Sequence, residues 1–322
     1  MPSQEDVLDC LVIGAGPAGL TAATYLARYH RCIAVIDAGA SRARWIPTSH
    51  NCPGFPFGVG GRELLGKMRE QAEGYGAVIT PGRVTSLRRD ADDGFVAEDE
   101  DRQQWRARHV VLATGIVDRL PEMDDIEGAI DAGAIRLCAV CDGYEASDEC
   151  IAVHAPVDDA VQHALFLRTF SRAVSVLPTA PGEPSAECAR LAREAGVQVL
   201  PVPQRIEHLA GEGCRITLAD GGVHRFDTVY PVLGGDAQSA LARELGAEVD
   251  DDHELVVDAR QQTSIDGLYA IGDIVSALNQ ISVAVGQAAI AATAIHNRLP
   301  RNFRGDTDSQ PACAQSLPSP QA

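Results

Sequence analysis

The chain has 322 residues, a length sufficient for two ordinary domains that each bury a sizeable core. Hydrophobic residues make up 45% and charged residues 22%, which is typical of a globular protein. The formal net charge of -18 argues against nucleic acid and anionic membranes as partners, because both bind basic patches. No apolar run is long enough to cross a bilayer, and the acidic start "MPSQEDVLDC" is unlike a signal peptide. We therefore expect a cytoplasmic protein.

The first predicted unit is a βαβ unit near the N-terminus. A buried strand over 9–13 runs into "GAGPAG", a helical pattern follows over 20–29, and a second strand over 32–36 ends at Asp37. Three glycines provide a tight turn, close approach to a pyrophosphate and close helix packing, namely Gly14, Gly16 and Gly19. Asp37 follows at the distance of a carboxylate that accepts a ribose hydroxyl. The pattern predicts a dinucleotide site, with a ligand-free glycine turn as the alternative.

The middle of the chain predicts further strands and helices. An amphipathic helix is expected over 61–74, strand-like segments lie around Val84 and Phe95, and a buried strand over 109–113 ends in "ATG". A second strand–turn–helix follows in "IAVHAPVDDAVQHALFLRTF".

The C-terminal part predicts a return to the first domain. "TSIDGLYAIGD" reads as a strand leading to Gly272 and Asp273, and an alanine-rich helix is expected over 281–299. The segment from Pro300 is polar and rich in Pro, Ser and Gln, so we expect a mobile tail.

The stretch "LCAVCDGYEA" contains the one C-x-x-C pair of the sequence, Cys138 and Cys141, followed by Asp142. Two thiols at this spacing can close a readily reduced ring, and an adjacent carboxylate can pass a proton to the leaving thiolate. A zinc site needs a second ligand pair, which the isolated Cys150, Cys188 and Cys214 do not provide. Two inert buried cysteines are the other alternative. We expect a redox-active pair and no metal, and we expect the remaining cysteines to be packed as small side chains.

The order and spacing of "VIGAGPAGLTAATYLAR", "HNCPGFP", "ATG", "CAVCDGYE" and "GLYAIGD" resemble the low-molecular-weight thioredoxin reductase family over nearly the whole chain. The resemblance implies an α/β fold of two Rossmann-like three-layer domains and a homodimer. The FAD-binding domain would be split into 1–117 and 247–299 by an inserted NAD(P)-binding-like domain over 118–246 that carries the cysteine pair. Residues 300–322 would form the tail, and the domains would rotate about hinges near 117–121 and 246.

The resemblance also implies site residues. The predicted FAD-binding residues are Gly14, Gly16, Pro17, Ala18, Gly19, Asp37, Asn51, Thr114, Gly115, Gly272, Asp273, Gln280 and Ile281. Cys141 would exchange electrons with the flavin, Cys138 with an external disulfide, and Asp142 would manage the thiol proton.

The second nucleotide turn departs from the family pattern. "APVDDA", over 155–160, contains no glycine, Pro156 removes one N–H group, and Asp158 and Asp159 place carboxylates where a pyrophosphate would lie. The following "PTAPGEPSAE" has no Lys or Arg for a 2′-phosphate and includes Glu183 and Glu187. We expect a retained fold with a lost nicotinamide site, so that NADPH is a doubtful cofactor; weak binding through backbone contacts is the alternative.

A second departure is "SRARWIP" over 41–47, which replaces a glycine-rich turn of the family. We expect Arg42, Arg44 and Trp45 near the flavin or its access channel. Cys52 follows Asn51, and a packing role is favoured over flavin contact.

Three functions are compatible with these residues. The first is a thioredoxin-reductase-like FAD-dependent thiol-disulfide oxidoreductase that exchanges electrons with a thioredoxin-like protein or a small dithiol or disulfide, fed by ferredoxin or another reduced carrier. The second is a dithiol oxidase that forms disulfides with oxygen as acceptor, favoured by the likeness of "CDGYE" to a disulfide-forming branch of the family. The third is a non-catalytic flavoprotein that binds or senses, which the intact cysteine pair disfavours.

Overall fold

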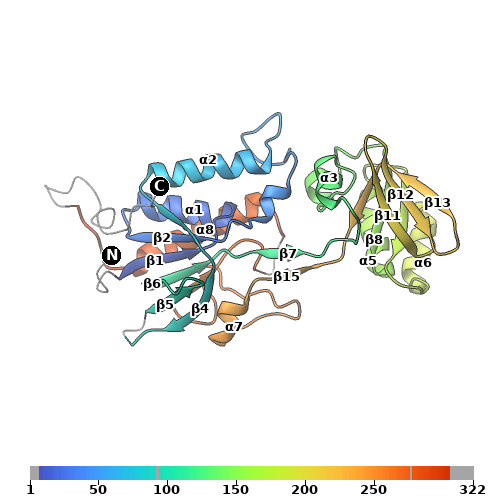
Figure 1. Cartoon of the computed structure of the whole chain (residues 1–322). Coiled ribbons are helices and arrows are strands. Elements are labelled where there is room, and N and C mark those ends of the chain that lie inside the picture. The colour runs from blue at the N-terminus through green and yellow to red at the C-terminus, as the bar shows by residue number, and fades with distance from the viewer. Residues whose placement is uncertain (1–6, 92–93, 276–277, 305–322) are drawn as a thin grey trace. The chain divides into compact units, whose positions relative to one another are not determined.

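The computed structural model describes residues 7–91, 94–275 and 278–304, which form two compact units (Figure 1). The first unit combines the described residues of 1–44, 62–117 and 236–322, and the second combines 45–61 and 118–235. Most of the predicted tail, including Cys313, lies outside the described residues. The predicted α/β class with two Rossmann-like domains is confirmed, because each unit is built on a sheet with a parallel core of strands packed against helices.

The first unit contains a seven-stranded sheet in the order β3-β2-β1-β6-β5-β4, with β16 paired to β6. Its strands are β1 (Leu8–Ile13), β2 (Ile33–Asp37), β3 (Val78–Pro81), β4 (Val84–Arg89), β5 (Phe95–Asp99), β6 (Gln104–Leu112) and β16 (Leu268–Ala270). Besides β1, β6 pairs with two further strands: Gln104 to Ala107 pair antiparallel with β5, and Val110 to Leu112 pair parallel with β16. The carboxyl ends of β1, β2, β6 and β16 therefore meet at one edge, where ligands of open α/β sheets bind.

Two cores lie on the faces of this sheet. On one face α1 (Pro17–Arg28), α2 (Gly61–Gly74) and α8 (Ile281–Arg298) pack on the strands, and α1 contacts α8 extensively. Small residues on both of these helices, such as Ala22, Ala288 and Ala292, permit the close approach. On the opposite face, side chains of the sheet strands, including those of β4 and β5, pack with α7 (Ala240–Glu244) and the loops around Leu255.

The second unit has a parallel sheet in the order β10-β9-β8-β14. Its elements are α3 (Ile126–Asp131), α4 (Ala139–Asp142), β8 (Cys150–Ala155), α5 (Val157–Leu167), β9 (Ala173–Pro178), α6 (Ala186–Ala195), β10 (Gln198–Val199), β11 (Pro203–Leu209), β12 (Gly213–Leu218), β13 (Val223–Phe226) and β14 (Thr228–Pro231). Helices α5 and α6 bury one face of the sheet, and the antiparallel β11-β12-β13 sheet with α3 buries the other. This unit thus has three layers.

The chain passes between the units through β7 (Ile116–Asp118) and β15 (Gly235–Ala237), which pair with each other (Figure 1). Arg119 N–H donates to the Gly234 carbonyl at 3.0 Å and extends this pairing. The compact units differ from the predicted domain limits in two places. Residues 45–61, which include the four-residue 3₁₀-helix end at Trp45, cluster with the second unit, and that unit ends at Gly235 rather than at Gly246.

Among the described helices, none combines the length and apolarity needed to cross a bilayer.

Candidate active site

The turn between β1 and α1 is shaped by glycines. Gly14 has a φ of +104°, and a Cβ on it would lie 2.3 Å from the Ala113 carbonyl oxygen. A Cβ on Gly19 would lie 1.9 Å from the Gly14 carbonyl oxygen, so only glycine lets α1 pack this closely on the turn. Gly16 is the N-cap of α1 and has no side-chain cap within the described residues, while Pro17 occupies the first turn. The free N–H groups of this 12-residue helix therefore suit an anionic ligand.

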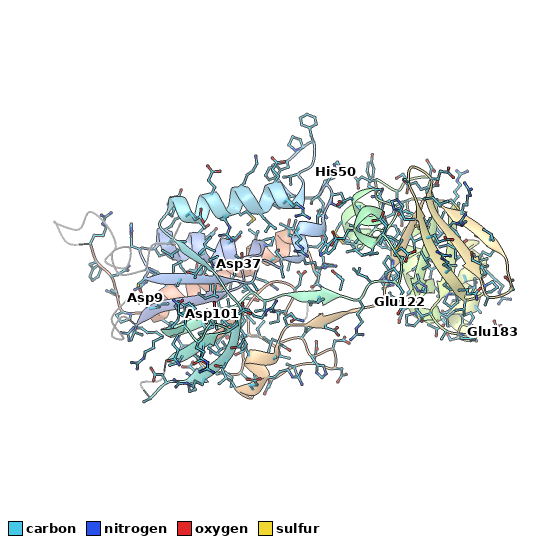
Figure 2. All side chains as sticks on the ribbon, viewed as in Figure 1. Asp9, Asp37, His50, Asp101, Glu122 and Glu183 are labelled. Atoms are coloured by element: carbon cyan, nitrogen blue, oxygen red, sulfur yellow. A yellow bond between two sulfur atoms is a disulfide. The ribbon has the colours of Figure 1, made fainter. Side chains whose placement is uncertain are left out.

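Asp37 ends β2 and lies half-buried in the first unit (Figure 2). Its Oδ2 accepts from Arg69 Nη2 of α2 at 2.7 Å, and its Oδ1 accepts from the Gly39 N–H at 3.0 Å. Arg69 thereby fixes the orientation of the carboxylate at the sheet edge. The remaining lone pairs of the carboxylate can accept from a ribose hydroxyl.

Asp273 lies after β16 and forms an ion pair with Arg42, whose Nη1 is 3.3 Å from Asp273 Oδ2. Gly272, at a φ of +76°, donates its N–H to Gln287 Oε1 of α8 at 2.7 Å. Gln280 is the extended N-cap of α8 and Ile281 is the first helical residue, so these two follow the acid at the same edge of the unit. Of the three residues expected near the flavin from "SRARWIP", Arg42 thus lies in the first unit beside Asp273.

Thr114 and Gly115 follow β6 at the carboxyl edge of the sheet. Thr114 Oγ1 donates to the Gln238 carbonyl at 2.8 Å, and the Gly115 carbonyl accepts from the Gln238 N–H at 3.0 Å. The segment after β6 is therefore tied to the segment that returns from the second unit.

These residues fit FAD. The glycine turn is a cradle that a Cβ would fill, the first turn of α1 offers uncapped N–H groups, and Asp37 supplies an acceptor at the end of β2. Of the predicted FAD-binding residues, all except Asn51 lie in the first unit. Asn51 clusters with the second unit, where it is exposed and accepts from Ser49 Oγ at 3.1 Å.

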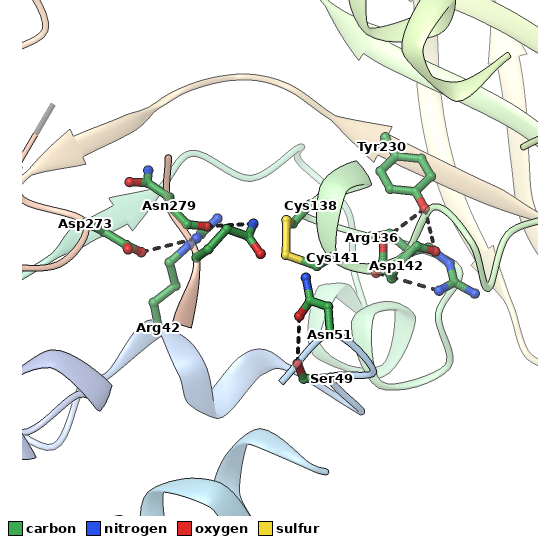
Figure 3. The surroundings of a disulfide bond; sticks show 11 residues. Arg42, Ser49, Asn51, Arg136, Cys138, Cys141, Asp142, Tyr230, Asp273 and Asn279 are labelled. Atoms are coloured by element: carbon green, nitrogen blue, oxygen red, sulfur yellow. Dashed lines mark hydrogen bonds and ion pairs between the residues drawn. A yellow bond between two sulfur atoms is a disulfide. The ribbon is translucent and has the colours of Figure 1, made fainter. Parts of the chain in front are cut away.

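Cys138 and Cys141 form a disulfide in the second unit, with an S–S distance of 2.05 Å and a Cα–Cα distance of 5.3 Å. The single turn of α4 brings them together, because Cys138 is its N-cap and the Cys138 carbonyl accepts from the Cys141 N–H at 2.9 Å. Both cysteines are half-buried. Asn51, which belongs to the same unit, lies beside the disulfide (Figure 3).

Asp142 is held by two side chains that the sequence did not single out (Figure 3). Tyr230 of β14 donates its hydroxyl to Asp142 Oδ1 at 2.9 Å, and Arg136 Nη1 lies 3.6 Å from Asp142 Oδ2. Burial raises the pKa of the Asp142 carboxyl above its usual value, and Arg136 and the Tyr230 hydrogen bond oppose that rise. A carboxyl with a raised pKa next to a disulfide is suited to proton transfer.

The turn between β8 and α5 has the architecture of the first turn without its glycines. Pro156 is the N-cap of α5, and Asp158 and Asp159 lie in the first helical turn. Asp158 Oδ1 accepts from the Ser185 N–H at 2.9 Å, which links the start of α5 to the start of α6 and lowers the pKa of Asp158. Glu183, in the intervening loop, is exposed (Figure 2).

Five further cysteines among the described residues are free. Cys10, Cys188 and Cys214 are buried, and burial raises the pKa of the Cys214 thiol to about 11. Cys52 and Cys150 are half-buried, and burial also raises their pKa values. A raised pKa keeps a thiol protonated and unreactive, which is consistent with packing roles.

Sequence reasoning identified the cysteine pair but not the partners of its neighbouring acid. Tyr230 is 88 residues from Asp142, and no local pattern links the two. Arg136 carried a usable signal, since it is a cation two residues before Cys138 in an otherwise apolar stretch. Trp45, expected near the flavin, belongs to the second unit and packs against a core that includes residues of α3.

Comparisons with known proteins show the family to which the chain belongs. A family model described as pyridine nucleotide-disulphide oxidoreductase matches residues 8–288. The chain is 31% identical over 287 residues to a thioredoxin reductase of Mycolicibacterium smegmatis, covering 85% of this chain and 91% of the relative. It is 29% identical over 306 residues to a thioredoxin reductase of Aquifex aeolicus, covering 91% and 93%.

A solved structure has the same fold. The thioredoxin reductase of Streptococcus pyogenes superimposes with a TM-score of 0.83 at 29% identity, covering 90% of this chain and 97% of that one. Together with the glycine cradle and the C-x-x-C disulfide, these matches identify the chain as a member of the low-molecular-weight thioredoxin reductase family and as an FAD-dependent disulfide oxidoreductase.

Proposed function

We propose that the protein exchanges electrons between FAD and the Cys138–Cys141 pair, and between that pair and an external disulfide or dithiol. The observation that carries this proposal is the disulfide itself, half-buried and followed by a carboxyl whose pKa is raised. A structural disulfide needs no such acid, whereas thiol–disulfide exchange requires a proton acceptor and donor.

The predicted residues divide the binding of FAD among them. The pyrophosphate would bind at the turn around Gly14 and at the backbone N–H groups of Gly16, Ala18 and Gly19, beside Pro17. Asp37 is suited to the ribose. Thr114, Gly115, Gly272 and Asp273 line the edge of the same sheet, and Gln280 and Ile281 present the N-terminus of α8. Bound FAD supplies a two-electron carrier.

Three residues carry out the proposed thiol–disulfide chemistry. Reduction of the disulfide takes two electrons and two protons and leaves two thiols. Cys138 forms and breaks the mixed disulfide with the external substrate, while Cys141 exchanges electrons with the flavin. Asp142 delivers the proton to the leaving thiolate and takes it back in the reverse direction.

We infer that NADPH is used poorly. The turn over 155–160 has no glycine to admit a pyrophosphate, and the carboxylates of Asp158 and Asp159 lie in the first turn of α5. No cation lies in the sequence 178–187, where a 2′-phosphate would need one. The electrons then come from another reduced carrier such as ferredoxin, or from the thiol substrate.

A thioredoxin-like protein or a small dithiol is the proposed partner, and the names of the relatives support the former. A dithiol oxidase with oxygen as acceptor is the second candidate, and the sequence "CDGYE" together with the altered nucleotide turn favours it. A binding or sensing flavoprotein without catalysis is the third. A cytoplasmic homodimer stays a prediction from the resemblance.

The experiment is anaerobic reduction of the purified holoprotein followed through the visible absorbance of the flavin. We expect little bleaching with NADPH or NADH and rapid bleaching with a small dithiol. Rapid bleaching at micromolar nucleotide would overturn the loss of the nicotinamide site. Admitting air and measuring peroxide then separates an oxidase from a reductase that needs another electron donor.

Matched cysteine variants test the redox pair. Cys141→Ser should bind FAD but lose reduction of the flavin by dithiol, and Cys138→Ser should lose exchange with the external disulfide. Cys150→Ser, a half-buried thiol outside the pair, is the control and should behave as the wild type. Full reduction of the flavin by dithiol in Cys141→Ser would exclude the proposed route through the cysteine pair, whereas a wild-type flavin that no dithiol reduces would leave the non-catalytic alternative.

A further inference from the structure

A buried polar cluster lies behind the redox disulfide in the second unit. It consists of Asp142, Tyr230, Arg136 and Glu149, and all four side chains are at least half-buried. Tyr230 is 2% exposed and stands among the apolar residues of the β8–β14 core. A buried tyrosine hydroxyl requires a partner, and here it reaches both Asp142 Oδ1 at 2.9 Å and the Asp142 carbonyl at 3.4 Å.

Arg136 connects the two acids of the cluster. Its Nη1 lies 3.6 Å from Asp142 Oδ2, and its Nη2 lies 3.8 Å from Glu149 Oε1. Arg136 Nε and Glu149 Oε2 are buried atoms with no hydrogen-bond partner among the described residues. Buried polar atoms without hydrogen-bond partners destabilise the folded state, so the stability of the fold does not explain why this cluster is buried.

We propose that Tyr230 and Arg136 are positioning residues that hold the Asp142 carboxylate and set the pH range in which it accepts the thiol proton of Cys141. This inference rests on the proposed function and names the residues that control its proton step. Tyr230 donates to the carboxylate and Arg136 adds a positive charge, so both favour the ionised form of Asp142.

The reduced cysteine pair can reduce an external disulfide without any further electron carrier. The Cys138 thiolate attacks an external disulfide, forming a mixed disulfide and releasing one thiolate. Cys141 then attacks Cys138 Sγ as its proton passes to the Asp142 carboxylate, the second thiolate leaves, and the Cys138–Cys141 disulfide forms. The two released thiolates take up the proton held by Asp142 and the proton that Cys138 had lost to water, so that two protein thiols are oxidised and one external disulfide is reduced to two thiols.

The charges around Asp142 determine whether a substitution raises or lowers the pKa of its carboxyl. Burial and the nearby Glu145 raise the pKa of Asp142, while Arg136 and Tyr230 lower it. Glu149 carries a raised pKa of its own, because burial and the nearby Asp227 and Asp142 outweigh Arg136. Removing the Tyr230 hydroxyl therefore leaves burial less opposed and raises the pKa of Asp142 further.

The test compares Tyr230→Phe with Tyr144→Phe. Tyr144 is the tyrosine of the same motif but is 77% exposed and is not part of the cluster, so its variant controls for the loss of a hydroxyl. Holoenzyme is reduced with a small dithiol under nitrogen, freed of reagent, and mixed with a self-quenched fluorescent glutathione disulfide across a range of pH. In Tyr230→Phe we expect the acidic limb of the rate profile to move upward by about one to two pH units, since a hydrogen bond to a charged group is lost.

The rate at high pH separates positioning from misfolding. If Tyr230 acts through Asp142, the Tyr230→Phe rate returns to the wild-type value once the pH exceeds the new pKa, whereas a damaged fold lowers the rate at every pH. Arg136→Met should shift the limb in the same direction, and Arg136→Lys, which keeps the positive charge, should shift it less. The infrared band of the protonated carboxyl, assigned by its loss in Asp142→Asn, should titrate with the same shift.

The outcomes distinguish the inference from the function. An unchanged pH profile and infrared titration in Tyr230→Phe would overturn the positioning role while leaving the redox pair intact. A wild-type enzyme whose reduced form does not react with disulfides at any pH would overturn the proposed function itself.

Discussion

The two strand–turn–helix units of this chain have the same architecture but different chemistry at the turn. Between β1 and α1, glycines let the backbone turn tightly and leave the helix N-terminus uncapped. Between β8 and α5, a proline begins the helix and the Asp158 carboxylate is used to hold the neighbouring helix α6 through Ser185. The same strand–turn–helix fold therefore forms both around a glycine turn that leaves the helix N-terminus uncapped and around a turn whose carboxylate ties two helices together.

The largest expected difference between the two turns concerns their packing. Gly19→Ala should destabilise the first unit by about 3 kcal/mol and abolish FAD retention, because the new Cβ has no space against the Gly14 carbonyl. Chemical denaturation and the flavin content of purified protein measure both effects. Ala155→Gly in the second turn should cost only about 1 kcal/mol and leave FAD content unchanged.

Gly66→Ala is the control for adding a methyl group to a helix, since nothing lies within 4 Å of its Cβ. It should be neutral or stabilise the protein by up to about 1 kcal/mol. Full flavin content in Gly19→Ala would show that the close packing of α1 is not needed for the cofactor.

The carboxylate of Asp37, at the end of β2, should contribute to the affinity for FAD. Asp37→Ala should weaken FAD binding roughly 10- to 100-fold, because one hydrogen bond to a charged group is lost. Flavin fluorescence titration of the deflavinated protein measures the change. Arg69→Met keeps the Asp37 carboxylate and removes its ion pair, together with the exposed pair between Arg69 and Glu73, so a loss as large as that of Asp37→Ala would assign the effect to Arg69 instead.

Restoring glycines to the second turn should sharpen the comparison. Pro156→Gly combined with Asp159→Gly should increase NADH affinity by a few-fold, up to about 10-fold, since one N–H group returns and one carboxylate leaves. Quenching of nucleotide fluorescence detects the binding without requiring catalysis. Tight binding of NADH by the unmodified chain would contradict the proposal that the second turn binds nucleotides poorly.

The smallest expected effect is that of the tether between α5 and α6. The Ser185 N–H holds the pKa of Asp158 below its usual value, so its contribution is present above pH of about 4 and is lost as the pH falls through the lowered pKa. Asp158→Asn should therefore be slightly less stable than the wild type at neutral pH and equal to it in acid. A stability difference that grows in acid would contradict this assignment.

Sequence alone located the elements that depend on local pattern. The helix over 61–74 was predicted with its observed bounds, since Leu65, Met68 and Ala72 repeat on one face and pack into the first core. The glycine turn and the cysteine pair were also found, because each is a short motif with a fixed spacing.

Features that depend on distant residues were not predicted. The Asp37–Arg69 and Asp142–Tyr230 contacts join residues 32 and 88 positions apart. The antiparallel β11-β12-β13 sheet was missed although β12 alternates regularly between buried and half-buried residues, because its neighbours β11 and β13 each bury a single residue and do not alternate. Such contacts are set by the topology of the sheet, which a local pattern does not encode.

The pairing of β7 with β15 has a consequence for how this chain can change. Because the insert over 118–235 begins and ends at one strand pair, its two termini leave it side by side. Modules with adjacent ends can be exchanged, cut out or permuted with only short joins. The segment that carries the Cys138–Cys141 pair can therefore be replaced by recombination while the segments on either side of it are inherited intact.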